Sequence, residues 1–378
     1  MISNQRHLFD IPEDVAYLNC AYTAPLLRAA TQAGQKAIKA KENPWNITSK
    51  NFFSGIETVR GLFARLVGCE SSCVAIVPAV SYGIALAAVN LPIEENQTIV
   101  VLQDQFPSNI YSWRRLAALK NAVIKTVRRP ADSDWTYALL EAIENNTSIV
   151  AVPNCHWTDG TLIDLVKIGE KSRAVGASLV VDGTQSLGAM PFSVSEVKPD
   201  FLVATSHKWL LGPYSFGFCY VAPKWHNGIP LEENWLNRAG SENFARLVHY
   251  QDDYQIGARK FDMGEVSNFI LTPIVAAALK QLLNWGVENI AQTIQAKTDA
   301  IAERVKQMGL LVAPMHVRAP HMIGVSKAQG FGDELPNLLA NEKVFVSVRG
   351  ESIRISPHLY NTDEEIERLF SALEKAMQ

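Results

Sequence analysis

The stretch that decides the fold is residues 180–218, which read VVDGTQSLGAMPFSVSEVKPDFLVATSHKWLLGPYSFGF. Two short apolar runs lie in or beside it: residues 178–181 stop at Asp182, and residues 201–204 are followed four positions later by Lys208. Short apolar runs that end in turn residues are typical of buried strands. Because ligands of open α/β sheets bind beyond the carboxyl ends of the strands, the pattern predicts a site that contains Asp182 and Lys208.

An acid and a lysine at such a sheet edge suit one cofactor. The amine of a lysine forms a Schiff base with a carbonyl group, and pyridoxal phosphate (PLP) carries one. PLP works as an electron sink while its ring nitrogen stays protonated, and a buried carboxylate keeps it so. We therefore predict that Lys208 carries PLP and Asp182 holds its ring nitrogen, with Thr205 and His207 on the phosphate. Each residue alone has a plainer interpretation, a turn residue or a solvated charge, so the hypothesis depends on the joint pattern.

This joint pattern resembles the class V aminotransferase superfamily, which contains small-substrate aminotransferases, cysteine desulfurases, kynureninases and isopenicillin-N-epimerase-like proteins. The resemblance is carried by Asp-Gly-x-Gln-Ser-x-Gly-x-x-Pro from residue 182 onward, then by Pro-Asp, Ser-His-Lys-Trp, Gly-Pro and Gly-Phe. A second match is residues 353–366, IRISPHLYNTDEEI, which resembles the C-terminal signature of the superfamily. The resemblance extends from about residue 15 to the end of the sequence.

The resemblance implies an α/β protein with the PLP-dependent transferase fold of type I. Residues 21–270 are expected to form a large PLP-binding domain with a mostly parallel seven-stranded sheet. Residues 271–378 are expected to form a helical linker and a small C-terminal α+β domain, and residues 1–20 to cross the mouth of the active site. Strand-like and helix-like runs alternate over most of the chain, as a parallel sheet requires. The superfamily also implies a homodimer with the site at the subunit interface.

The cofactor-binding residues follow largely from the same resemblance. A strand over residues 74–77 leads into a helix, and free backbone N–H groups at such a helix start bind phosphate. The superfamily also places an aromatic ring against PLP after the next strand, and it places a glutamine near the ring 3-hydroxyl. The residues expected to bind PLP are Ala79, Val80, Ser81, Phe106, Trp157, Asp182, Gln185, Thr205, His207, Lys208, Ser267 and Asn268.

Two positions depart from the pattern of the superfamily. Class V dimers have a Gly-Thr that donates to the phosphate bound in the neighbouring subunit, whereas this chain has Gly264 and Glu265. A carboxylate repels a phosphate, so Ser267 or Asn268 is expected to take over this role. Desulfurases typically have an asparagine where this chain has Trp157, which is closer to the aromatic residue of kynureninase-type sequences.

The resemblance also points to the residues that meet the substrate, an amino acid. The arginine of the C-terminal signature binds the substrate α-carboxylate through a planar two-point contact that lysine cannot copy. Arg354 occupies that position, with Arg349 as a helper. Tyr22 is a further candidate contact, with a packing role as the alternative. His156 is expected to line the pocket beside Trp157, either as an acid/base group or as a hydrogen-bonded structural histidine.

Composition and charge narrow the class of protein. The 378 residues have a net charge of −3, with 48% hydrophobic and 19% charged residues, which gives no sign of a nucleic-acid partner. Because no leader pattern and no apolar run of transmembrane length is present, we expect a cytoplasmic protein without a membrane partner. The five scattered cysteines agree with a reducing compartment. Cys69 and Cys73 lack a second Cys/His pair nearby, so no metal site is predicted.

The outcome of the reaction is left open by these residues, as are the particular amino acid and the pathway. Transamination, C–S or C–C cleavage and epimerisation share a step in which Lys208 removes the α-proton as general base. An aminotransferase is the leading hypothesis, and a lyase or an epimerase is the alternative. A desulfurase is disfavoured because no cysteine lies beyond Cys219.

Two other classes of protein are disfavoured as well. A nicotinamide enzyme would have Gly-x-Gly-x-x-Gly after a strand, and this chain does not. A cofactor-free interaction module on the same fold gains some support from Glu265. Such a module would have no need of Asp182, Lys208 and Arg354 together.

Overall fold

The computed structural model describes residues 1–332, 334–350 and 352–377. Within them, a seven-stranded sheet forms the centre of the molecule. Its strands are, in spatial order, β2 (Val74–Val77), β8 (Gly217–Val221), β7 (Phe201–Thr205), β6 (Ser178–Asp182), β5 (Thr147–Pro153), β3 (Thr98–Leu102) and β4 (Val123–Val127). β8 is antiparallel to both of its neighbours, β2 and β7, and the other paired strands of this sheet are parallel. The predicted α/β fold with a mostly parallel seven-stranded sheet is confirmed.

The central strands are buried on both faces. Every residue of β2, β3, β6, β7 and β8 is buried. Successive side chains point to opposite faces, so Val100 joins one hydrophobic core while Ile99 and Val101 join the other. Helices cover both faces, and the strands therefore have continuous apolar sequences instead of alternating ones.

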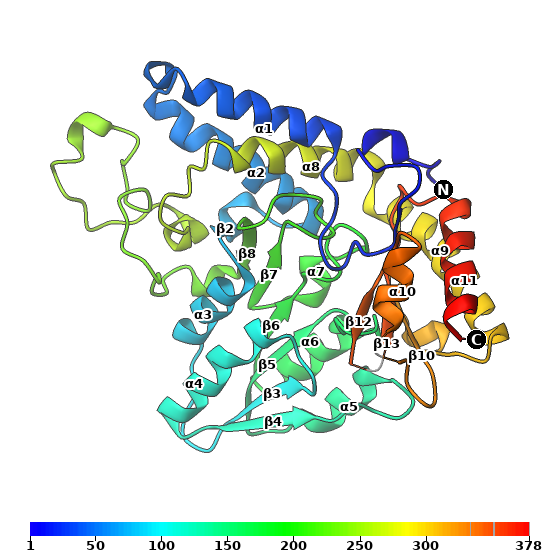
Figure 1. Ribbon diagram of the computed structural model, residues 1–378. Helices are drawn as coiled ribbons and strands as arrows, with labels where there is room; N and C mark the ends of the chain where they lie inside the picture. The colour runs from blue at the N-terminus through cyan, green and yellow to red at the C-terminus, as the bar shows by residue number, and fades with distance from the viewer. Residues whose placement is uncertain (333, 351, 378) are drawn as a thin grey trace.

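The covering helices pack in groups on the two faces of the sheet. Figure 1 shows α1, α2 and α8 side by side at one end of the molecule. None of the helices in the described part of the chain is long and apolar enough to span a membrane. The helices that cover the two faces of the central sheet are α1 (Arg28–Lys41), α2 (Ser49–Val67), α3 (Val80–Asn90), α4 (Tyr111–Lys120), α5 (Trp135–Ala142), α6 (Leu165–Ala174), α7 (Val194–Val197) and α8 (Leu271–Trp285).

Local sequence signals set the ends of several helices. Helix α2 ends at Gly68, which adopts a left-handed conformation with φ 71°. A capping box begins α11 (Asp363–Met377). The Glu365 N–H donates to Thr362 Oγ1 (3.3 Å), and the Thr362 N–H donates to the Glu365 carboxylate (2.8 Å).

The C-terminal region builds a second, smaller sheet. Its strands are β12 (Ser347–Arg349), β13 (Ser352–Ile355), β10 (Ile323–Ser326) and β9 (Leu311–Val312), all paired antiparallel in this order. Two more helices, α9 (Val287–Gln307) and α10 (Leu335–Asn341), pack with α11 against this sheet around a separate hydrophobic core. The N-terminal strand β1 (Ala16–Tyr17) pairs with β11 (Val344–Phe345). The predicted domain boundaries near residues 20 and 270 stay predictions.

Residues 238–259 form a surface arm without regular strands. Val248, Tyr250 and Ile256 on this arm are 76%, 94% and 80% exposed. Figure 1 shows the arm projecting from the body of the molecule at the left.

Candidate active site

Strands β6 and β7 are parallel neighbours and end at the same edge of the sheet. Asp182 is the last residue of β6 and Thr205 the last of β7, and Lys208 follows in the next turn. That turn is closed by a hydrogen bond from the Gly212 N–H to the Ser206 carbonyl (2.7 Å). A Cβ at residue 212 would lie 2.7 Å from Ser206 Cβ, so the turn needs a glycine there.

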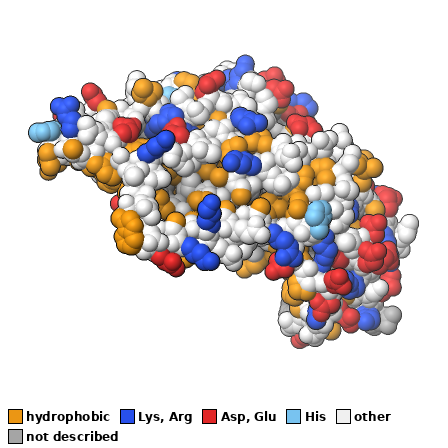
Figure 2. Space-filling model, turned by 90° about the horizontal axis from the view of Figure 1, so that it is seen from above, with side chains coloured by type: hydrophobic (Ala, Val, Ile, Leu, Met, Phe, Trp, Pro, Cys, Tyr) orange, Lys and Arg blue, Asp and Glu red, His pale blue; other side chains and the backbone are white. Residues whose placement is uncertain are grey.

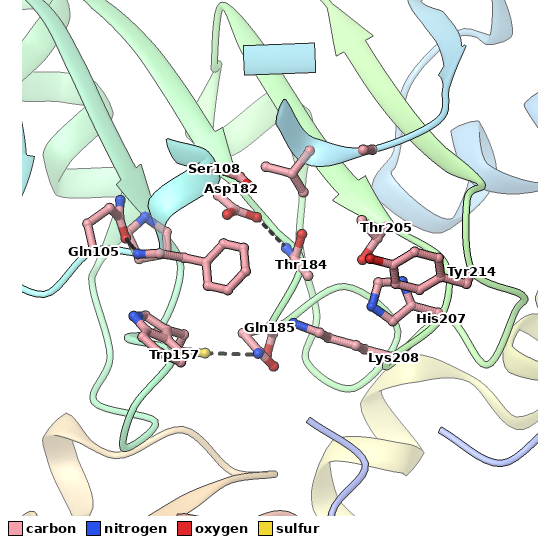
Figure 3. A pocket seen from close by; sticks show the side chains of 15 residues that line it. Gln105, Ser108, Trp157, Asp182, Thr184, Gln185, Thr205, His207, Lys208 and Tyr214 are labelled. Carbon is pink, nitrogen blue, oxygen red and sulfur yellow. Dashed lines mark hydrogen bonds between the residues drawn. The ribbon is translucent and has the colours of Figure 1, made fainter. Parts of the chain in front are cut away.

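A cavity of about 150 Å³ opens at this edge. Figure 3 shows side chains from several segments of the chain pointing into it. All predicted cofactor-binding residues except Ser81, Ser267 and Asn268 line the cavity. These lining residues are Ala79, Val80, Phe106, Trp157, Asp182, Gln185, Thr205, His207 and Lys208.

Lys208 is largely buried, which disfavours its ammonium form. Burial and then the positive charge of Arg354 lower the pKa of Lys208 to about 8, while Asp182 acts in the opposite direction. The Lys208 Nζ lies 5.4 Å from the centroid of the Phe106 ring, and Figure 3 shows the side chain extending toward Gln185. The lowered pKa makes the neutral, nucleophilic amine accessible near neutral pH.

Asp182 is only 6% exposed. Its Oδ1 accepts a hydrogen bond from the Thr184 N–H (3.0 Å). Burial raises the pKa of Asp182, and the Thr184 hydrogen bonds and Lys208 act in the opposite direction. No ion pair joins this carboxylate to a cation within the described residues. A buried carboxylate of this kind is stabilised by a cationic group of a ligand.

Part of the cavity wall is suited to an anion. Ala79 precedes α3 and provides no capping side chain, so the first N–H groups of the helix lack intrahelical partners. Thr205 Oγ1 and His207 Nδ1 are buried without a hydrogen-bond partner among the described residues. Burial, followed by the charge of Lys208, lowers the pKa of His207 to about 4. The His207 ring is therefore neutral and available as a hydrogen-bonding group.

Two aromatic side chains form another wall. The rings of Phe106 and Trp157 meet edge to face, with centroids 5.4 Å apart. The Trp157 indole is anchored by a hydrogen bond to the Asp104 carbonyl (2.6 Å). Flat apolar faces of this kind accommodate a flat aromatic ligand.

Gln185 is fixed between two other parts of the chain. Its Nε2 donates to the Ala21 carbonyl (3.1 Å), and its Oε1 accepts from Trp209 Nε1 (3.0 Å). Trp209, the residue after Lys208, is therefore hydrogen-bonded to the segment that follows β6. The predicted position of Gln185 near a ring hydroxyl stays a prediction.

A second cavity of about 390 Å³ lies at the mouth of the first. It shares Lys208 and Trp157 with the first cavity and adds Tyr22, Arg349 and Arg354. Arg354 is 1% exposed, and its Nη1 donates to the Trp157 carbonyl (2.6 Å). Burial, followed by the charge of Arg349, lowers the pKa of Arg354 to about 9. Two of the three predicted substrate contacts, Arg354 and Tyr22, thus line one cavity together with Lys208.

His156 does not line either of these cavities. It is fully buried, and its ring stacks on Trp135 with centroids 5.3 Å apart. Its Nδ1 contacts Thr158 Oγ1 (2.7 Å) and Arg129 Nη2 (3.1 Å), and its Nε2 contacts the Gln103 carbonyl (3.1 Å). The expected position of His156 in the pocket wall is therefore wrong, and its contacts agree with the interpretation as a hydrogen-bonded structural histidine.

Three predicted cofactor-binding residues lie outside the cavities. Ser81 is exposed on α3. Ser267 Oγ donates to the Phe52 carbonyl (2.5 Å), and Asn268 Oδ1 accepts from the Leu271 N–H (2.8 Å) at the start of α8. Ser267 and Asn268 line a separate groove between α1, α2 and α8. Within a single subunit, neither side chain reaches the Lys208 cavity.

Several lining residues were not predicted from the sequence. Gln105, Ser108, Cys155, Thr184 and Tyr214 also face the first cavity. Ser108 and Thr184 belong to motifs that the sequence displays, Phe-Pro-Ser-Asn and Asp-Gly-Thr-Gln, so those motifs were the available signal. The Tyr214 ring lies 4.6 Å from His207 but is 74% exposed, and no pattern in the sequence marked it.

Together these features define a class of protein. A lysine with a lowered pKa, a buried carboxylate and an anion-suited helix start, all at one edge of a mostly parallel sheet, are the parts of a PLP-dependent enzyme of fold type I. The sequence profile described as "Aminotransferase class-V" matches residues 16–369. The chain belongs to this family of PLP-dependent enzymes.

Two curated relatives cover most of the chain. An uncharacterized aminotransferase, YcbU of Bacillus subtilis (strain 168), is 30% identical over 314 residues, which are 82% of this chain and 80% of that protein. Isopenicillin N epimerase of Streptomyces clavuligerus is 27% identical over 383 residues, or 95% of this chain and 94% of the epimerase.

Solved structures show the same fold. A C-DES mutant with glycine covalently linked to its PLP cofactor superimposes with a TM-score of 0.89 at 18% identity, covering 98% of this chain and 99% of that one. The apo cysteine desulfurase of Thermococcus onnurineus NA1 gives a TM-score of 0.85 at 17% identity, covering 99% of this chain and 98% of that one.

Proposed function

We propose that this protein is an aminotransferase that acts on a free α-amino acid. The observation that carries the proposal is the placement of Lys208, Asp182 and Arg354 on two adjoining cavities. They supply a nucleophilic amine, a buried acid and a guanidinium for a carboxylate. The Bacillus subtilis relative that is named as an aminotransferase supports transamination as the reaction.

Epimerisation is the second candidate reaction. Isopenicillin N epimerase aligns with 95% of this chain, more than the aminotransferase relative does. A C–S or C–C lyase has only the likeness of fold to C-DES in its favour. A desulfurase that works through a cysteine in the C-terminal region is disfavoured, because no cysteine lies beyond Cys219.

The residues of the first cavity fit PLP. Asp182 is a buried carboxylate without a cationic partner among the described residues, and it suits a protonated ring nitrogen. Thr205 Oγ1 and His207 Nδ1 are buried polar atoms without partners, and with the Val80 N–H they suit the phosphate. Phe106 provides a flat face for the ring.

The proposed mechanism assigns one task to each of these residues. When bound, PLP supplies an electrophilic carbon and an electron sink. Arg354 orients the substrate by gripping its α-carboxylate through two parallel hydrogen bonds. Because the pKa of Lys208 is about 8, a fraction of its amine is neutral near neutral pH. The neutral Nζ accepts the proton from the substrate α-carbon and returns it to another atom. Asp182 keeps its negative charge opposite the ring nitrogen, so a proton is held there.

A homodimer is part of the proposal. The groove between α1, α2 and α8 is lined mainly by apolar atoms and includes Ser267 and Asn268. Figure 2 shows the face over α1 and α8, where basic side chains stand among apolar ones. In class V dimers this part of the chain serves the phosphate of the neighbouring subunit, which suits the position of Ser267 outside its own cavity. We also expect the cytoplasm as its location, because all five cysteines are free.

The first test concerns the cofactor. Protein incubated with PLP is reduced with borohydride, digested and analysed by mass spectrometry. We expect the pyridoxyl group on Lys208 and no labelling of the Lys208→Ala variant. Lys120→Ala is the matched control, because Lys120 is exposed at the end of α4. Labelling of Lys208→Ala to the wild-type extent would exclude Lys208 as the cofactor lysine.

The second test separates the reactions. The loaded enzyme is incubated with single L-amino acids, with and without an α-keto acid. An aminotransferase forms a new amino acid only when the keto acid is present. Racemisation of the substrate without keto acid formation would replace the proposal by epimerisation, and release of ammonia without an acceptor would replace it by a lyase.

A further inference from the structure

Two arginines project from the same face of one hairpin at the mouth of the active site. In the pairing of β12 with β13, Ser347 lies opposite Arg354. Arg349 is two residues further along β12 than Ser347, so its side chain shares the face of Arg354. Such diagonal neighbours are about 7–8 Å apart, within reach of long side chains. The hairpin therefore presents two guanidinium groups side by side.

Both guanidinium groups face the same cavity as Lys208. Arg354 is anchored through the Trp157 carbonyl, while its Nε is buried without a partner among the described residues. The Arg349 Cζ lies 5.8 Å from the centroid of the Trp157 ring and 5.9 Å from that of Tyr22. Arg354 thus contacts the backbone of Trp157, and Arg349 lies near its ring.

The charged side chains that line the second cavity are positive. Within the described residues, no carboxylate forms an ion pair with Arg349 or Arg354. Asp182 is the one acid among the described residues that line the two adjoining cavities, and it lies in the inner one. A ligand that brings a single carboxylate would leave one of the two neighbouring cations, the buried Arg354 or the half-buried Arg349, uncompensated, which is costly.

We propose that the substrate is a dicarboxylic amino acid, with Arg354 on the α-carboxylate and Arg349 on the carboxylate of the side chain. This inference rests on the proposed function, since it names the class of amino acid that the same site takes. The rings of Tyr22 and Trp157 lie against the Arg349 guanidinium, whose Nη1 donates to the Val348 carbonyl (2.7 Å). The other N–H groups of Arg349 are left for the ligand. A second carboxylate then forms a charge-assisted hydrogen-bonded pair with Arg349.

A competing arrangement places both arginines on one α-carboxylate. The two arrangements differ in what Arg349 recognises. If Arg349 only assists Arg354, its loss weakens every amino acid equally. If Arg349 binds the side-chain carboxylate, its loss weakens acidic amino acids and spares their amides.

The experiment compares L-glutamate with L-glutamine, and L-aspartate with L-asparagine, on the PLP-loaded enzyme. We expect kcat/KM to favour one acid over its amide by roughly tenfold or more, the scale of one charge-assisted hydrogen bond. In Arg349→Met this preference should fall to about unity, and Arg349→Lys should retain part of it, because lysine keeps the charge and loses the planar fork. Arg65→Met, on an exposed position of α2, is the matched control and should keep the full preference.

A binding measurement on wild-type enzyme keeps the inference testable even if the variants fail to fold. Glutarate and succinate carry two carboxylates and no amine, whereas butyrate carries one carboxylate. Calorimetric titration of the loaded enzyme should show at least one diacid binding roughly tenfold or more tighter than butyrate.

Each outcome decides the question. Equal use of acids and amides by wild-type enzyme, or an equal loss for both in Arg349→Met, would overturn the dicarboxylate assignment and leave the aminotransferase proposal intact. Failure of the aminotransferase proposal would be seen instead as the absence of any amino transfer, and glutarate binding could still be measured.

Discussion

The edge of the central sheet and the mouth of the cavity are built in different ways. At the edge, Asp182 and Lys208 come from neighbouring parallel strands and the turn after them, within one short stretch of the sequence. At the mouth, Tyr22, Trp157 and Arg354 come from three distant segments. The edge is positioned by strand register inside a buried sheet, whereas the mouth depends on how the C-terminal sheet sits against the N-terminal segment. The side chains at the edge are therefore positioned by the buried sheet, and those at the mouth by contacts between distant segments of the chain.

The largest expected effect comes from Asp182→Asn, which alters the edge alone. The amide keeps the size of the side chain and removes the negative charge opposite the ring nitrogen. We expect kcat to fall on the order of 10²–10³-fold, the range for one preorganised electrostatic group. Steady-state kinetics of the loaded enzymes would measure this loss. A fall of less than threefold in kcat would show that the charge of Asp182 is not needed.

The same variant should affect stability in the opposite direction. Burial raises the pKa of Asp182 above its ordinary value of 3.8, so the folded apoprotein binds this proton more tightly than the unfolded chain. The resulting stabilisation is complete below the unfolded pKa and is lost as pH rises through the folded pKa. Relative to Asp182→Asn, the wild-type apoprotein should therefore lose thermal stability as the pH rises from the ordinary value of 3.8 through the raised pKa of the folded state. Thermal unfolding of both apoproteins across that range checks the direction.

A second prediction links the mouth to the edge. Arg354 is the second-largest cause, after burial, of the lowering of the Lys208 pKa to about 8. In Arg354→Met, the pH midpoint for attachment of PLP to the apoprotein should move upward from about 8. It should stay below the ordinary lysine value of 10.5, because burial, the larger cause, remains. Borohydride trapping after short incubations across pH gives the midpoint.

The control for this experiment is Arg354→Lys, which preserves a positive charge at the mouth. Its midpoint should remain near that of the wild type, although the planar contact with a carboxylate is lost. If the methionine and lysine variants show the same midpoint, the charge of Arg354 does not act on Lys208, and the two regions are electrostatically independent.

The sequence predicted the edge more completely than the mouth, and the reason is physical. Strand ends that carry Asp182 and Lys208 are local patterns, and parallel pairing places them together without further information. The direction of the His156 ring is set by Arg129 and Trp135, which precede it by more than 20 residues, so no local pattern reveals it. The shared face of Arg349 and Arg354 depends on the register of the β12–β13 hairpin.

Residues that act between subunits are the hardest to place from one sequence. Ser267 was expected to serve the phosphate, and within one subunit its hydroxyl bonds the Phe52 carbonyl instead. The spacing of the motif carries no information on which copy of the chain the side chain faces.

The smallest expected effect comes from Thr205→Val, again at the edge. Valine has the shape of threonine and the same preference for a strand, so β7 should be unaffected. The Thr205 hydroxyl is buried without a partner among the described residues, so its removal should leave the apoprotein as stable as wild type or slightly more stable. The affinity for PLP should fall roughly tenfold, because one hydrogen bond to the phosphate is lost. Equilibrium titration with PLP and thermal unfolding of the apoprotein measure the two effects separately.

An unchanged affinity would mean that the phosphate lies elsewhere in the cavity, and a clear loss of apoprotein stability would mean that the hydroxyl serves the fold. Opposite signs in the two measurements would assign Thr205 to the ligand, as the geometry of the sheet edge implies.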